Sequence, residues 1–153
     1  MLEEWLVDGY NLLHACASEA SRRKVSRETL LSELAGFAAS KAQRMLVVLD
    51  GSGDPAEWQA HHSEFLRVVY SQKVSADAYL ERHLFEHRGK ANFTVVTNDR
   101  AITNIARGGG ARVLGTETFL EMIRETRKES SETLQKNKAR SHGFNRPFDD
   151  KLK

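Results

Sequence analysis

Four aspartates stand where carboxylates can do chemistry. Asp8, Asp50 and Asp99 each close an apolar run of β type, and Asp77 opens a stretch with helical spacing. Because ligands of an open parallel α/β sheet bind at the carboxyl ends of its strands, we expect these carboxylates to gather on one rim. Two unpaired carboxylates about 4 Å apart repel by about 4 kcal/mol at an effective dielectric of about 20, so such a cluster must bind a proton or a cation.

The expected cation is a hard divalent metal ion. Oxygen ligands favour Mg²⁺ or Mn²⁺ over zinc, and Mg²⁺ also accepts phosphate oxygens of a substrate. Such a site suits phosphodiester hydrolysis. We expect Asp8, Asp77 and Asp99 to be catalytic metal ligands, and Asp50 to be either a further ligand or the start of an Asp-Gly turn. The supporting candidates, which could orient water, bond neighbouring backbone or extend the acidic cluster, are Asn11, Glu81 and Asn98.

A local role is the alternative for each aspartate taken alone. Aspartate favours turns and helix N-caps because its side chain bonds nearby backbone N–H groups. The catalytic interpretation therefore depends on several carboxylates converging.

Other polar and aromatic residues carry weaker signals. His83 and His87 are one helical turn apart and could bind zinc, but no further ligand pattern accompanies them, so structural or surface roles are favoured. Tyr10 and His14 lie near the expected rim, where they contact nucleotides or simply pack and cap.

Strands and helices alternate in the predicted framework. Apolar runs predict strands near residues 5–8, 45–50, 67–71, 93–98 and 111–114. Helical spacing follows Ser26, spans 75–87 and 99–107, and resumes at Thr118, which forms a capping-box pattern with Glu121. This alternation predicts an α/β fold with a parallel sheet.

The bulk composition indicates a soluble protein of one compact domain. At 153 residues, with 40% hydrophobic and 29% charged side chains, the chain holds no apolar run long enough for a membrane span. The early first strand leaves no room for a secretory signal, and the lone Cys16 agrees with a reducing compartment, so we expect a cytoplasmic protein. We divide the chain into a domain over 1–125 and a basic extension over 126–153 that is flexible or partner-bound.

The net charge of +2 is too small to indicate a polyanionic partner, but the basic residues are unevenly placed. Lys73 and Arg100 lie close in sequence to the aspartates and are candidates to guide phosphates, although solvated surface charge explains them equally. The basic tail suits RNA binding or simple solubility through Lys136, Lys138 and Arg140.

Four segments carry a family resemblance. They are VDGYNLL at 7–13, VLDG at 48–51, SADAYLE at 75–81 and VVTNDR at 95–100. In this order they resemble the bacterial NYN domain, and more specifically its YacP-like branch, with matches over about residues 5–123.

The resemblance implies a PIN-like three-layer fold, in which a central, mostly parallel sheet is flanked by helices. It also implies an endoribonuclease dependent on Mg²⁺ or Mn²⁺. Asp8, Asp77 and Asp99 match the acidic positions of the family, Asp50 an additional one, and Asn11 the polar residue of the first motif. The implied partner is single-stranded RNA, with the ribosome or a translating mRNA as a further candidate.

Two other functions remain open from the sequence. A non-catalytic RNA-binding or ribosome-associated adaptor could keep this fold and use the basic segments. A small-molecule phosphohydrolase is less well supported, because the first strand supplies Asp8 without a second nearby acidic nucleophile.

Overall fold

The computed structural model describes residues 3–19, 27–53, 62–129, 131–132 and 135. Within them a five-stranded sheet has the order β3-β2-β1-β4-β5, and every pair of neighbouring strands is parallel. The strands are β1 (Glu4–Asp8), β2 (Arg44–Leu49), β3 (Leu66–Tyr70), β4 (Phe93–Val96) and β5 (Arg112–Leu114). The expected parallel α/β fold is confirmed.

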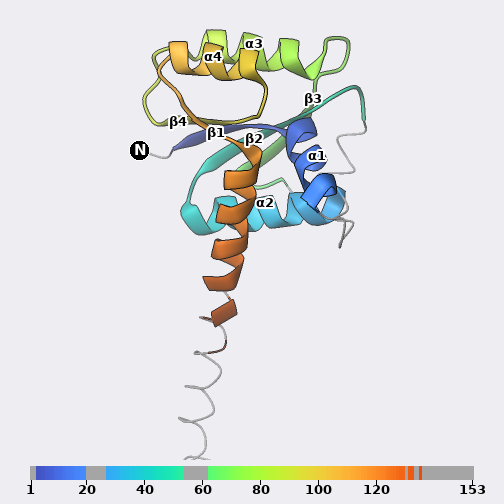
Figure 1. The fold of residues 1–153 in the computed structure, drawn as a ribbon, viewed down its shortest axis with the longest axis vertical. Coiled ribbons are helices and arrows are strands. Elements are labelled where there is room, and N and C mark those ends of the chain that lie inside the picture. The colour runs from blue at the N-terminus through green and yellow to red at the C-terminus, as the bar shows by residue number, and fades with distance from the viewer. Residues whose placement is uncertain (1–2, 20–26, 54–61, 130, 133–134, 136–153) are drawn as a thin grey trace, which may run out of the picture.

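Helices cover both faces of the sheet, which gives three layers (Figure 1). α3 (Ala76–Glu86) and α4 (Arg100–Gly108) lie on one face. α1 (Gly9–Glu19), α2 (Arg27–Lys41) and a last helix over 116–129 lie on the other. In the described residues no helix is both long and apolar enough to cross a bilayer.

The central strand is buried on both faces because its side chains alternate between two cores. Trp5 and Val7 of β1 pack in the core under α1 and α2, whereas Leu6 packs in the core under α3 and α4. A strand covered on both sides reads as a continuous apolar run, which is why β1 could be recognised in the sequence. Its last residue, Asp8, therefore lies at the carboxyl end of the central strand.

Two helix starts differ from the sequence prediction. α1 was not predicted, and it begins at Gly9 immediately after Asp8. The last helix begins at residue 116 rather than at Thr118, since the N–H of Phe119 already donates to the carbonyl oxygen of Gly115 at 3.1 Å. The predicted capping box is therefore wrong, because Thr118 lies inside the helix.

The predicted boundary between residues 125 and 126 falls within this last helix. Helical structure continues to residue 129, and Arg127 bonds Glu33 of α2 at 2.7 Å. Residues 136–153, which include most of the predicted basic extension, lie outside the described residues.

Candidate active site at the carboxyl end of the sheet

Asp8 is almost fully buried and held by three hydrogen bonds. It is 1% exposed. The backbone N–H of Asn11 donates to Asp8 Oδ1 at 3.2 Å, and the side-chain Nδ2 of Asn11 donates to Oδ2. The hydroxyl of Thr97 also donates to Oδ2, at 3.2 Å. These bonds fix the carboxylate in one orientation.

Gly9 allows α1 to leave the sheet directly after Asp8. A Cβ at this position would lie 2.7 Å from the carbonyl oxygen of Val48 and 2.6 Å from Leu49 Cδ2. Only glycine accepts so close an approach of β2 without displacing the backbone. The short passage from β1 to α1 brings Asn11 back over Asp8.

Thr97 links Asp8 to Asp99. Its hydroxyl donates to Asp8 and accepts the backbone N–H of Asp99 at 3.1 Å. Asp99 is the N-cap of α4, and its Oδ1 accepts the N–H of Ile102 at 3.0 Å. Sequence reasoning missed Thr97 as a site residue, although its place two residues before Asp99 at the end of a strand was the available signal.

Asp77 and Asp50 meet at the N-terminus of α3. Ser75 caps this helix by accepting the N–H of Ala78 at 3.1 Å, and Asp77 lies exposed in the first turn. Asp50 Oδ1 accepts the N–H of Ala76 at 3.1 Å and the hydroxyl of Ser71 at 3.3 Å. Asp50 therefore fastens α3 to the end of β2, which is a structural role beside its predicted metal role.

The carboxylates of this rim act on one another electrostatically. The pKa of Asp77 is raised from its ordinary value, first by partial removal from water and then by the negative charges of Asp99, Asp8, Glu81 and Asp50. Among the described residues, no lysine, arginine or histidine forms an ion pair with any of these five side chains. The predicted acids thus lie near one another, and no basic side chain of the described residues pairs with them.

The carboxylates of the rim are not arranged around a common metal position. In the part of the chain that the structure describes, no group of three or more His, Cys, Asp or Glu side chains is placed to hold a metal ion. The donor set nevertheless fits a hard divalent cation, because it is all oxygen, negatively charged and unpaired. Asp77 is exposed, so its side chain can turn towards a cation, whereas Asp50 is held by its bonds to Ala76 and Ser71.

The remaining predicted residues take separate positions. The side chain of Asn98 bonds Thr116 and not the carboxylates. Its Nδ2 donates to Thr116 Oγ1 at 2.6 Å, and its Oδ1 accepts the Thr116 N–H at 3.0 Å. It fastens the start of the last helix, which is the backbone-bonding role considered for it. Lys73 and Arg100 are exposed, just before α3 and at the first residue of α4. Three predicted RNA contacts lie outside the described residues: Lys136, Lys138 and Arg140.

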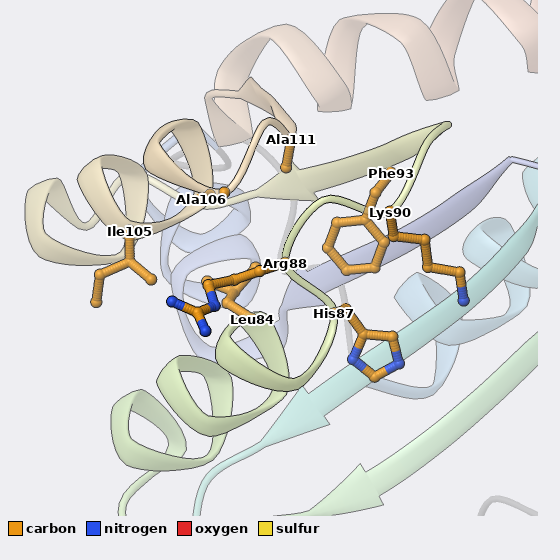
Figure 2. Close-up of a pocket in the computed structure, with 9 residues that line it drawn as sticks. Leu84, His87, Arg88, Lys90, Phe93, Ile105, Ala106 and Ala111 are labelled. Atoms are coloured by element: carbon orange, nitrogen blue, oxygen red, sulfur yellow. The ribbon is translucent and has the colours of Figure 1, made fainter.

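The two histidines belong to the opposite end of the strands. His83 and His87 stack with ring centroids 4.1 Å apart near Phe93, the first residue of β4. Burial lowers the pKa of His83, and the neighbouring His87 lowers it further. Figure 2 shows His87 and Arg88 beside Phe93 at a small pocket. Among the described residues no third ligand joins them, so nothing here favours a zinc site.

A protein-family model matches nearly the whole chain. The model of the YacP-like NYN domain matches residues 5–153. The chain belongs to the YacP-like NYN family. This is a PIN-like nuclease family, and its match extends through the tail, beyond the segments that carried the resemblance.

Solved structures resemble this NYN domain over nearly its whole length. Rae1 (YacP) from Bacillus subtilis superposes with a TM-score of 0.73 at 18% sequence identity, covering 99% of this chain and 90% of the other. A tryptophan-to-leucine mutant of the same protein gives a TM-score of 0.70 at 20% identity, covering 90% of this chain and 85% of the other. At such identities the likeness establishes the fold. No curated protein sequence matches this chain.

Proposed function

We propose that this NYN domain is an endoribonuclease that hydrolyses RNA phosphodiester bonds with Mg²⁺ or Mn²⁺. The observation that carries the proposal is the acidic rim, where partial burial and then several neighbouring carboxylates raise the pKa of Asp77. Among the described residues these acids have no ion-pair partner. Uncompensated charge of this kind is typical of functional sites, because a purely structural cluster would be neutralised. Membership of a PIN-like nuclease family agrees with it.

Asp8, Asp77 and Asp99 are the proposed catalytic ligands, with Asp50 as an additional one and Glu81 adding negative charge. When bound, a divalent cation supplies Lewis acidity towards water and phosphate. Asp8 provides the fixed point of the site, because Asn11 and Thr97 hold it in one orientation. The exposed Asp77 adapts to the ion and to the substrate phosphate, whereas Asp50 is held in place by its bonds to Ala76 and Ser71.

Basic residues lie close in sequence to the rim aspartates, and others occur in the tail. Lys73 and Arg100 are proposed to attract phosphates of an incoming strand, since each is exposed and lies within a few residues of a rim aspartate in the sequence. The tail residues Lys136, Lys138 and Arg140 are proposed to add affinity for the backbone. The proposed substrate is single-stranded RNA in the cytoplasm, with ribosome-bound mRNA as the form to test beside free RNA.

The decisive experiment compares wild type with Asp8→Asn. Purified wild type should cut single-stranded RNA in Mg²⁺ or Mn²⁺ and stop when EDTA is added. Asp8→Asn should remove nearly all cleavage, because it deletes the buried negative charge while keeping the size of the side chain. Circular dichroism and thermal unfolding control for loss of fold. Full turnover by Asp8→Asn contradicts the assigned role, and RNA binding without products in any metal favours the non-catalytic adaptor.

A further inference from the structure

Two aromatic side chains stand out because both are highly exposed and they occupy opposite ends of the fold. Tyr10 is 61% exposed and Phe85 is 62% exposed. Tyr10 lies in the first turn of α1, two residues after Asp8 and directly before Asn11. Phe85 lies in the last turn of α3, at the far end from Asp77. Burial in a core therefore explains neither ring.

The ring of Tyr10 lies beside a second ring of the same helix. It lies nearly parallel to the ring of His14, with an angle of 8° between the planes and centroids 6.2 Å apart. His14 follows one helical turn later, so both rings project from the same side of α1. At this separation the two rings do not overlap face to face, and with 61% of Tyr10 exposed its ring is open to solvent. A tyrosine has only two side-chain torsions, so its ring loses little conformational freedom when a ligand stacks on it.

The position of Tyr10 connects it to the carboxylate rim. Its Cα lies no more than about 7.6 Å from that of Asp8, since two peptide links separate them. A strand whose phosphate approaches Asp8 would thus bring a neighbouring base within reach of the tyrosine ring. Aromatic rings accept any base by stacking, and this contact is available only to bases that are unpaired or splayed out.

We propose that Tyr10 is a base-stacking platform for an unpaired nucleotide beside the phosphate at the carboxylate rim. This inference rests on the proposed function, and it assigns the substrate preference for single-stranded RNA to a specific side chain. Phe85 does not share the role, because the guanidinium of Arg88 lies 4.1 Å from its ring centroid and the rim is at the other end of α3.

The test measures binding rather than cleavage. A short fluorescein-labelled single-stranded RNA with phosphorothioate linkages is titrated by fluorescence anisotropy in Mg²⁺ with wild type, Tyr10→Ala, Tyr10→Trp and Phe85→Ala. Tyr10→Ala should raise Kd by about five-fold or more, the scale of one lost base stack. Tyr10→Trp should bind at least as tightly as wild type. Phe85→Ala, the equally exposed control, should bind as wild type does.

An abasic version of the RNA separates stacking from other contacts. If Tyr10 stacks on a base, Tyr10→Ala and wild type should bind the abasic strand with equal affinity. An unchanged Kd for Tyr10→Ala on intact RNA overturns the proposal, as does an equal loss on the abasic strand or an absence of measurable binding by wild type. Because the readout does not need turnover, RNA binding that depends on Tyr10 can hold even if cleavage fails, and cleavage can hold without it.

Discussion

The two ends of the sheet place acidic side chains in opposite electrostatic surroundings. At the amino end, Glu4 pairs with Lys90 at 2.7 Å, and Glu3 pairs with Arg112 and accepts the hydroxyl of Thr94. Burial alone would raise the pKa of Glu3, but the bonds from Thr94 and Arg112 and the charge of Arg112 outweigh it and lower the pKa. At the other end, the pKa of Asp77 is raised by partial burial and by its acidic neighbours.

These opposite pKa directions mean that Glu3 stabilises the folded state at neutral pH and Asp77 destabilises it. A carboxylate with a lowered pKa favours the folded state at neutral pH, whereas one with a raised pKa opposes it. Among the described residues, basic side chains pair with the acids at the amino end of the sheet and none pairs with those at the carboxyl end. Proteins tolerate such a local cost where function requires it, so the comparison supports the proposal that the carboxyl end is the reactive one.

The largest expected effect comes from neutralising one acid at each end of the strands. Asp99→Asn should lower cleavage by about 100-fold or more, equivalent to about 2.7 kcal/mol on the barrier. Asparagine is also a good N-cap, so α4 should keep its start. The matched change Glu4→Gln should leave cleavage unchanged. Initial rates on the same RNA measure both, and similar losses in the two variants would remove the distinction between the ends.

Thr97 tests whether the rim depends on a buried hydroxyl. Thr97→Val keeps the shape but removes the donor to Asp8 and the acceptor for the Asp99 N–H, both in a buried position. Unfolding free energy should fall by about 1–3 kcal/mol, the cost of leaving buried polar groups unsatisfied. Cleavage should fall with it. Thr97→Ser keeps the hydroxyl and should recover most of the activity, as urea unfolding and rate measurements can show.

Glu3 tests the paired end through pH. Its folded-state pKa lies below the ordinary 4.5, so its contribution is present above that value and is lost as the pH falls through the lowered pKa. Glu3→Gln should destabilise the protein by about 1 kcal/mol at neutral pH. Thermal unfolding at several pH values should show this difference shrinking below pH 4.5. A difference that stays constant into acid would assign the effect to packing.

Asp77 should give the smallest change in stability, with the opposite sign. Its raised pKa means that the folded state carries a penalty at neutral pH that disappears as the pH falls towards the ordinary value of 3.8. Asp77→Asn should therefore stabilise the metal-free protein slightly, by less than about 1 kcal/mol because the group is exposed. Added Mg²⁺ should raise the Tm of wild type more than that of the variant, as differential scanning fluorimetry can measure.

Local sequence patterns predicted the strands and most of the helices, because the buried strands are continuous apolar runs. β1, β2 and β4 are apolar runs buried on both faces, so their ends, and hence Asp8 and Asp99, could be located from the sequence. α1 was not predicted, and the close approach of β2 that requires Gly9 is a tertiary contact that no local pattern shows. Because β1 and β4 are parallel neighbours, Asp8 and Asp99 follow strand ends at the same edge of the sheet.

The finer roles of the polar residues depend on partners far along the chain. Asp50 bonds Ala76, 26 residues away, and Asn98 bonds Thr116, 18 residues away. No local pattern distinguishes such anchors from ligands, because aspartate and asparagine bond backbone and cations with the same oxygen atoms. Thr97 was missed for a similar reason, since threonine is ordinary in a strand until its buried partner is known.

The bond between Asp8 and Thr97 joins residues 89 positions apart. During synthesis the N-terminal part of a chain emerges first. Asp8 therefore gains its bond from Thr97 only after β4 has been made and has paired with β1. Contacts this distant form late, because a long loop must close before they are gained. A truncated chain ending before Thr97 consequently carries Asp8 without either its hydroxyl donor or Asp99, and cannot assemble the carboxylate rim.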